Sequence, residues 1–346
     1  EESGEKPDVI ESRVRGALEL VGLEHAWGKS VFELSGGEKR RLAIAESLLV
    51  QAKLVLMDHP TADLDPPMKR EFYSILELLR ETGKTVVFTA SRAGDAEHAD
   101  STTVLEAPRQ AARFEPSILP LEEAMHEVLA VESLSFGYRR DRPVLLDVTF
   151  RAKSPGSLVI LGRNGAGKTT LGKLIAGLLK PWKGSIILGG RTVGRRDVVY
   201  VYQLPQDGFV GQTLIEDLAM SLKVLGYDKK RALERAKELL KSYGLEEQAE
   251  TPVFMLERGL SKLASILSSL LLRPRVIVLD EPTSGMDEDY ERLVRSLIKA
   301  VSKRSLVITI THDINFAKSI GERALVLRDG RVAYDGSPLE VREEML

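Results

Sequence analysis

Cysteine is absent from this chain of 346 residues. Its absence excludes a disulfide framework, a thiolate zinc site and an iron–sulfur cluster, and it agrees with a reducing compartment. No apolar run approaches the roughly 18 residues that a membrane-spanning helix needs, so any work at a membrane is expected from outside the bilayer. The chain also lacks a large excess of positive or negative charge, since it has 49 Lys and Arg residues and 51 Asp and Glu residues. We therefore expect no nucleic-acid partner.

What the chain does contain is an internal repeat, in which matching residues such as Asp58 and Asp280 lie 222 positions apart. The matched segments are Gly22-Leu23-Glu24 with Gly244-Leu245-Glu246, Leu34 with Leu256, Pro60-Thr61 with Pro282-Thr283, and Leu105 with Leu327. A repeat of this kind indicates two copies of one domain, and the 43% hydrophobic content suffices for two cores. The same offset puts the first copy's counterpart of Lys168 before residue 1. We therefore expect a first copy that is incomplete at its amino end, in a chain that opens on Glu1 rather than Met.

Short apolar segments alternate with helical ones in both copies, which is typical of parallel βαβ units. The predicted strands are residues 53–57, 85–89, 129–136, 144–151, 157–161, 198–202, 275–281 and 306–311, and the predicted helices are residues 10–23, 36–50, 68–80 and 228–241. Three prolines mark residues 107–127 as a linker. The expected domains are thus residues 1–106 and 128–346.

A phosphate-binding loop follows the strand at residues 157–161. It reads Leu161-Gly162-Arg163-Asn164-Gly165-Ala166-Gly167-Lys168-Thr169-Thr170. Glycines let backbone N–H groups surround a phosphate at a helix amino end, where the helix dipole favours anions. Lys168 adds a point charge, and Thr169 offers a hydroxyl to Mg²⁺. With a strand before it and a helix after it, this loop is more than a simple glycine turn, and it predicts ATP binding.

Polar residues at the ends of later strands complete the expected site. Asp280 and Glu281 end a buried strand, so Asp280 is predicted to act on Mg²⁺ and Glu281 to orient or deprotonate water. Gln203 is predicted to sense the γ-phosphate and Mg²⁺, and His312 to hydrogen-bond the γ-phosphate. Alone, the Asp-Glu pair would be weak evidence, Gln203 would be ordinary polar surface and His312 a structural residue with its hydrogen bonds satisfied. Their order along the chain after the phosphate loop favours a site.

An aromatic side chain is also expected to stack on the nucleotide base. Tyr138 is the natural choice, and nearby Phe136 is the alternative.

Together with these motifs, Leu34-Ser35-Gly36-Gly37-Glu38 resembles the signature of the ATP-binding cassette (ABC) nucleotide-binding domain. The resemblance covers nearly the whole chain. It implies an α/β fold of the ABC-type P-loop NTPase class in two tandem copies, the first incomplete at its amino end. In that family ATP lies between the phosphate loop of one domain and the signature of another. Ser35 and Gly37 would then face Lys168, with Gly36 and Glu38 also among the residues expected to bind ATP. This arrangement implies that the two halves pair within one chain.

The two copies depart from the family pattern in opposite ways. The second copy reads Glu257-Arg258-Gly259 at the signature position, where a carboxylate and a bulky side chain oppose a phosphate. In the first copy the residue matching Glu281 is His59, and at a constant offset the residue matching His312 is Ala90. Pairing of the two copies would form two ATP sites, each built from both copies. All these losses fall in the same one of those two sites. His59 could serve as a base near neutral pH, but a lost catalytic residue is the simpler interpretation.

Two further segments bear on the biological setting. Residues 62–65 and 284–287 resemble the loops that cross the domain interface of this family, and residues 204–218 resemble the membrane-contacting segment of energy-coupling-factor and cobalt-type importers. The resemblance implies an ATPase subunit at the cytoplasmic face of the membrane that powers uptake of a vitamin or metal ion through integral membrane transport subunits. The alternatives are a soluble tandem ABC protein that acts on ribosomes or other cytosolic machinery, and a purely regulatory nucleotide-binding module.

Overall fold

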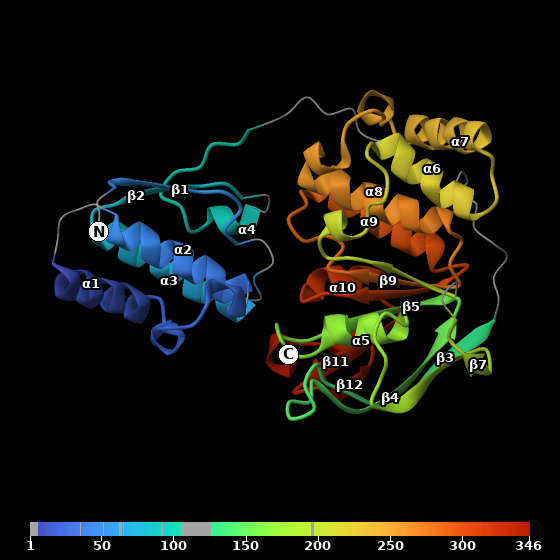
Figure 1. Ribbon diagram of the computed structural model, residues 1–346, viewed down its shortest axis with the longest axis horizontal. Coiled ribbons are helices and arrows are strands. Elements are labelled where there is room, and N and C mark those ends of the chain that lie inside the picture. Colours follow the sequence, from blue (N-terminus) through green and yellow to red (C-terminus); the bar gives the residue numbers. More distant parts are fainter. Residues whose placement is uncertain are drawn as a thin grey trace. The chain divides into compact units, whose positions relative to one another are not determined.

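The computed structural model describes residues 6–34, 36–50, 52–61, 64, 66–90, 93–105, 126–194 and 197–346, without the side chains of residues 36, 37, 40, 66 and 93. The chain divides into two compact units, residues 1–104 (unit 1) and 105–346 (unit 2). Figure 1 labels their helices and strands. Most of the expected linker, residues 107–125, lies outside the described residues.

Unit 1 packs three long helices against a small parallel sheet. It comprises α1 (Pro7–Leu20), α2 (Gly36–Leu49), β1 (Leu54–Met57), α3 (Pro66–Glu81), β2 (Thr85–Phe88) and the short α4 (Ala93–Ala96). Its core joins the helices to one sheet face through buried side chains such as Val21, Phe72 and Leu79. On the other face Leu56 is 71% exposed. Each strand in this unit therefore buries only one side within the described part of the chain.

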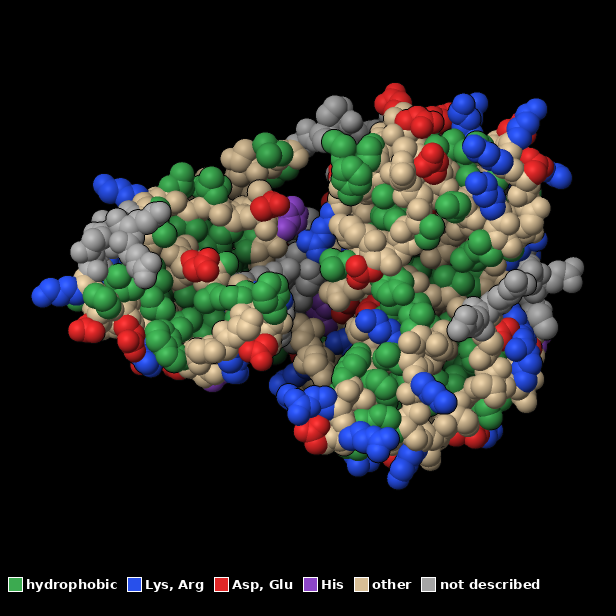
Figure 2. Space-filling view, viewed as in Figure 1, with side chains coloured by type: hydrophobic (Ala, Val, Ile, Leu, Met, Phe, Trp, Pro, Cys, Tyr) green, Lys and Arg blue, Asp and Glu red, His purple; other side chains and the backbone are tan. Residues whose placement is uncertain are grey.

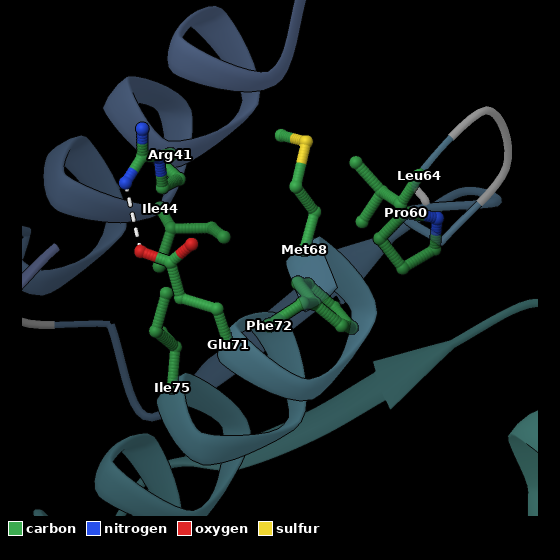
Figure 3. A pocket seen from close by; sticks show the side chains of 8 residues that line it. All are labelled: Arg41, Ile44, Pro60, Leu64, Met68, Glu71, Phe72 and Ile75. Atoms are coloured by element: carbon green, nitrogen blue, oxygen red, sulfur yellow. Dashed lines mark hydrogen bonds and ion pairs between the residues drawn. The ribbon is translucent and has the colours of Figure 1, made fainter. Parts of the chain in front are cut away.

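A small pocket of unit 1 lies between α2 and α3 (Figure 3). Arg41 and Glu71 flank it, and the Arg41 guanidinium donates to the Glu71 carboxylate over 2.7 Å. The matching residues of unit 2 are Leu263, which is fully buried, and Leu293, which is 9% exposed. The contact between these two helices is therefore partly polar in unit 1 and apolar in unit 2.

Unit 2 is built on a six-stranded sheet of order β12-β11-β5-β10-β9-β8, in which only β12 is antiparallel to its neighbour. Its strands are β5 (Gly156–Leu161), β8 (Val198–Val201), β9 (Val276–Asp280), β10 (Leu306–Ile310), β11 (Arg323–Arg328) and β12 (Arg331–Gly336). A second, antiparallel sheet has the order β4-β3-β6-β7 and comprises β3 (Glu127–Phe136), β4 (Leu145–Ser154), β6 (Lys183–Leu188) and β7 (Arg191–Thr192).

The α-helices in the described part of unit 2 are α5 (Lys168–Ile175), α6 (Leu214–Val224), α7 (Lys229–Ser242), α8 (Arg258–Leu271), α9 (Glu288–Val301) and α10 (Ile314–Ile320). Among the described residues, short 3₁₀ turns cover residues 24–26, 31–33, 205–207, 246–248, 253–255, 338–340 and 343–345.

The central strands β9 and β10 of unit 2 are buried on both faces, as their high content of Val, Ile and Leu indicates; the exceptions are Thr309 and the terminal Asp280. Alternate residues point to opposite sides: Val278 packs with α5 and the antiparallel sheet, while Ile277 packs with the helical layer. Figure 1 shows α8 and α9 on one side of the sheet and α5 and β4 on the other. Because both faces are covered, polar groups of these strands are reachable only at the strand ends.

The predicted strands and helices are confirmed, with shifted ends. α1 covers Pro7–Leu20 rather than residues 10–23, because proline is favoured in a first helical turn and Gly22, at φ 64°, ends the helix. β3 begins at Glu127, the last residue of the expected linker.

The repeat is visible in the structure, and strand pairing corrects it at one point. Helices α1, α2 and α3 begin 222 residues before α7, α8 and α9. However, Thr85 pairs with Leu54, whereas Leu306 pairs with Val276, so the offset into β2 is 221. The prediction that Ala90 matches His312 is therefore wrong by one residue, because the connection into β2 is one residue longer than the connection into β10. The match is Ser91, which lies outside the described residues, and the first copy still lacks the histidine.

Candidate functional site

The phosphate loop of unit 2 wraps around the ammonium group of its own lysine. Lys168 is 7% exposed, and its Nζ donates to the carbonyl oxygens of Gly162 over 2.6 Å and of Arg163 over 3.0 Å. Gly162 has φ 151°, and a Cβ there would lie 2.4 Å from the Leu327 carbonyl oxygen. Gly167, at φ 99°, directly precedes α5. The loop therefore needs glycine at these points, and its N–H groups and the start of α5 form an anion-binding end.

The remaining residues predicted from this loop lie along the same turn. Arg163, Asn164, Gly165 and Ala166 connect β5 to α5, and Thr169 and Thr170 lie in the first turn of that helix.

Asp280 is held at the carboxyl end of β9 next to this loop. Its Oδ2 accepts hydrogen bonds from Thr169 Oγ1 (2.9 Å) and Tyr200 OH (2.6 Å). Its Oδ1 is buried and has no hydrogen-bond partner in the described part of the chain. Burial raises the pKa of Asp280, while the hydrogen bonds from Tyr200 and Thr169 oppose that rise.

This donor set fits a divalent cation. An unpaired buried carboxylate oxygen beside a threonine hydroxyl offers hard oxygen ligands of the kind that Mg²⁺ takes. Among the described residues no group of three or more His, Cys, Asp or Glu side chains is placed to hold a metal ion. A cation here would therefore depend on phosphate oxygens of the nucleotide for part of its ligands.

Glu281 follows Asp280 in a left-handed backbone conformation, with φ 45°. Its Oε1 contacts His312 Nδ1 at 2.9 Å, and its Oε2 accepts a hydrogen bond from Thr311 Oγ1 at 3.2 Å. Burial disfavours protonated His312, but the hydrogen bond and charge of Glu281 outweigh it and raise the pKa of His312. The structure thus brings together Glu281 and His312, both predicted from sequence.

The exposed ring near the phosphate loop belongs to Tyr138. Its side chain is 63% exposed, and its hydroxyl lies 3.3 Å from Thr170 Oγ1. Phe136 is only 7% exposed and packs edge-on against the Tyr138 ring. Tyr138, rather than Phe136, therefore has a face open for stacking on a base.

Gln203 lies two residues beyond the end of β8 and is half-buried. Within the described part of the chain its side chain makes no hydrogen bond to Asp280 or Thr169. The structure therefore leaves Gln203 near the strand ends without joining it to the carboxylate.

The signature segment of unit 1 is described only in part. Ser35 lies outside the described residues, Gly36 and Gly37 begin α2, and Glu38 Oε1 is 2.9 Å from His25 Nε2 within the same unit. The meeting of this segment with Lys168 stays a prediction.

In the second copy the signature position is bound to its own unit. Glu257 Oε1 accepts a hydrogen bond from Tyr290 OH (2.6 Å), and the Tyr290 ring packs over Gly259. The Arg258 side chain covers Gly285, so close that a Cβ on that glycine would lie 2.5 Å from Arg258 Nε. These contacts occupy the backbone surface at the start of α8, where the first copy has glycines.

The first copy keeps the backbone of the Glu281 position but changes its chemistry. His59 has the same φ of 45°, and its Nδ1 lies 3.2 Å from Asp58 Oδ1 and 3.0 Å from Thr89 Oγ1. The Asp58 side chain is 88% exposed, whereas Asp280 is 2% exposed. In unit 1 the matching acid is therefore a surface group within the described residues.

Three residues of the site were not predicted from sequence. Tyr200 and Thr311 donate to the two carboxylates, and Lys262 Nζ donates to the Glu281 carbonyl oxygen. Thr311 could have been found, because it directly precedes His312. Tyr200 and Lys262 are distant in sequence from their partners, and no local pattern marks them.

Replacing Tyr200 with Phe tests how the buried Asp280 carboxylate is stabilised. The variant loses a donor to a charged acceptor, so we expect unit 2 to lose about 2 kcal/mol of stability at neutral pH. The pKa of Asp280 in the folded state is already raised by burial, and the variant raises it further. The difference from wild type should therefore shrink as the pH falls through that pKa, since protonated Asp280 needs the donor less.

Urea unfolding of both proteins at neutral and acid pH measures this difference. Tyr202→Phe is the matched control, since the Tyr202 ring neighbours Tyr200 and its hydroxyl does not bond Asp280. Equal stability of Tyr200→Phe and wild type at neutral pH would contradict the role given to the hydroxyl.

No helix among the described residues is long and apolar enough to cross a membrane.

Comparison with solved structures finds cbiO1 from Clostridium perfringens, part of the ABC transporter complex cbiONQ, with 26% identity and a TM-score of 0.56 over 62% of this chain and 90% of that one. A bacterial Atm1-family ABC exporter solved with ATP bound matches at 21% identity and a TM-score of 0.55, over 79% of this chain and 45% of that chain.

Curated relatives span nearly the whole chain. A Treponema denticola protein that bears the name of an ABC transporter ATP-binding protein is 29% identical over 370 residues, which cover 97% of this chain and 74% of the relative. YkoD of Bacillus subtilis, whose name links it to HMP/thiamine import, is 26% identical over 388 residues, 95% of this chain and 70% of its own length.

The family model described as ABC transporter matches residues 2–62 and 145–284, together more than half of the chain. This match falls in both copies of the repeat, and the second segment contains the phosphate loop, Asp280 and Glu281. The chain therefore belongs to the ABC transporter family, as an ATP-binding ATPase with two tandem segments of the ABC-type P-loop NTPase fold.

Proposed function

We propose that this chain is the ATP-hydrolysing subunit of an importer that takes up a vitamin or a metal ion through separate integral membrane subunits. The observation that carries the proposal is the cluster of Lys168, Asp280, Glu281 and His312 at one end of the parallel sheet of unit 2. The kind of transport follows from similarity to cbiO1 and YkoD, whose names place them in a cbiONQ complex and in thiamine import.

In this proposal Glu281 orients the attacking water and accepts its proton. The carboxylate is 2.9 Å from His312 and 3.2 Å from Thr311, and these two contacts set its direction. His312 uses Nδ1 toward Glu281, which leaves Nε2 to donate to the γ-phosphate. Its raised pKa favours the protonated ring, in which both nitrogens are donors.

The other residues of unit 2 bind the nucleotide. Lys168 and the N–H groups of residues 162–170 would hold the β- and γ-phosphates, and Tyr138 would stack on the base. Thr169, Asp280 and Gln203 would hold Mg²⁺, which when bound neutralises charge on the phosphate oxygens.

We further propose that the active site is shared by the two copies. Only the first copy carries a Ser-Gly-Gly signature, at residues 35–37, and only the second carries a phosphate loop in this sequence. Pairing within the chain would form one competent site. The other composite site would be degenerate, since His59 replaces the glutamate and Glu257 with Arg258 replaces the signature.

Apolar side chains at matching positions of the two units support docking to membrane subunits. Phe32 is 92% exposed and Phe254, its match in the repeat, is 75% exposed. Leu204 and Val210, which follow Gln203, are 55% and 72% exposed. Figure 2 shows apolar side chains interspersed with charged ones on the viewed surface of both units. We propose that this peripheral protein works at the cytoplasmic face of the membrane.

Replacing Glu281 with Gln removes a base but keeps its size, so we expect turnover of ATP to fall about 100-fold or more while ATP affinity stays within about twofold. Steady-state phosphate release and equilibrium binding of a fluorescent ATP analogue measure the two effects. Glu288→Gln, at the exposed start of α9, serves as the control. Wild-type turnover of the Glu281→Gln protein would refute the assignment.

Replacing Ser35 with Arg tests the shared site. A bulky cation at the signature should occupy the position of the γ-phosphate. Hydrolysis of ATP bound at the phosphate loop of Lys168, in the other unit, should therefore fall about 100-fold. The companion change Glu257→Ser should restore no second activity, because His59 remains. If Ser35→Arg hydrolyses ATP as wild type does, the two copies do not share a site.

Membrane association is tested by purifying the full chain from detergent-solubilised membranes. We expect an integral membrane protein to co-purify with wild type and to be lost from the double variant Phe32→Asp and Phe254→Asp, because charge is costly in an apolar interface. Leu339→Asp, at a position 72% exposed elsewhere on unit 2, is the matched control. Co-sedimentation with ribosomes instead would favour the soluble alternative.

A further inference from the structure

Lys262 is a buried cation outside the residues assigned to ATP. Only Lys168 and Lys262 are lysines less than 9% exposed among the described residues, and Lys262, on α8, is 4% exposed. A buried ammonium group is costly unless strong acceptors surround it. One acceptor of Lys262 Nζ is the backbone carbonyl oxygen of Glu281, at 2.5 Å. The charged group is thus directed at the backbone of the residue that carries the proposed base.

The backbone at Glu281 needs such support, because φ of 45° is unfavourable for a residue with a side chain. Its N–H donates to the Ile310 carbonyl oxygen over 2.9 Å, which ties it to β10. Its carbonyl oxygen accepts from the Ser284 N–H over 3.3 Å and from Lys262 over the shorter 2.5 Å. A charged donor forms the stronger hydrogen bond, so Lys262 is the main restraint on this carbonyl group.

The direction of the Glu281 carboxylate depends on this peptide unit. The position of the carbonyl oxygen is set by ψ of Glu281. Because the left-handed region is small, a change in ψ forces φ to change as well, and the side chain then leaves its contacts with His312 and Thr311. A displacement of about 1 Å at a reacting group is enough to slow a reaction about 100-fold. The peptide restraint therefore matters to the rate, and Lys262 acts on it through the Glu281 carbonyl oxygen.

We propose that Lys262 is a positioning residue for ATP hydrolysis, which holds the Glu281 peptide in the left-handed conformation that aims its carboxylate. The proposal rests on the role proposed for Glu281. The proposal also assigns a role in positioning Glu281 to α8. This helix begins at Arg258 in the altered signature and carries Lys262 one turn later. The matching residue of the first copy is Arg40, whose side chain lies outside the described residues.

The test compares Lys262→Met, which keeps length and removes the donor, with Lys262→Arg, which keeps a charged donor. In the full chain, Lys262→Met should lower kcat about 30-fold while the KM for ATP and the affinity for a fluorescent ATP analogue stay within about twofold, since binding groups are untouched. Lys262→Arg should recover at least a third of wild-type kcat. Ser261→Ala, a neighbouring buried hydroxyl without a partner in the described residues, should leave kcat within about twofold.

A double variant separates this proposal from the role of Glu281. If Lys262 acts through Glu281, the pair Lys262→Met and Glu281→Gln should be no slower than Glu281→Gln alone. Wild-type turnover of Glu281→Gln would overturn the role of Glu281. A slow Glu281→Gln beside an unimpaired Lys262→Met, or an additive double variant, would overturn only the role of Lys262.

Should Lys262→Met not fold, the shorter Lys262→Gln replaces it. We then expect kcat to fall about fivefold or more, and a wild-type kcat would overturn the proposal.

Discussion

Burial of the parallel sheet of unit 2 on both faces is the constraint on which the site depends. Side chains of β9 and β10 can point only into one of two apolar layers, so Val276 to Leu279 must be apolar. A charged side chain is first accommodated at the strand end, at Asp280, whereas inside these two strands the polar side chain is only the small hydroxyl of Thr309. Because the strands are parallel, their carboxyl ends meet at one edge, and the phosphate loop, Asp280 and His312 converge there.

Buried charge at this edge is tolerated because each group has donors matched to it. Tyr200 and Thr169 satisfy one oxygen of Asp280, and His312 and Thr311 satisfy the carboxylate of Glu281. Asp280 Oδ1 has no hydrogen-bond partner among the described residues, and a carboxylate oxygen of this kind fits a divalent cation. The same polar contacts therefore stabilise the fold and arrange the chemistry.

The two copies show which parts of the repeat are structural and which are chemical. His59 and Glu281 share the left-handed φ of 45°, so the turn at this strand end is a property of the fold. Their side chains differ, since one is an imidazole and the other a carboxylate. At this position the two copies therefore share backbone geometry and differ in side-chain chemistry.

The sequence by itself determined the repeat, the order of strands and helices, and the residues of the phosphate loop, because these depend on local spacing and on glycine and proline. It also identified Asp280, Glu281 and His312 through their position after apolar runs. Tertiary structure alone decided that Tyr200 and Lys262 belong with them, since 80 residues separate Tyr200 from Asp280 and 19 separate Lys262 from Glu281. It also decided the one-residue shift into β2, which only hydrogen-bonded strand pairing reveals. Local patterns record which face of an element is apolar, but the partner of a buried polar group is set by how distant elements pack.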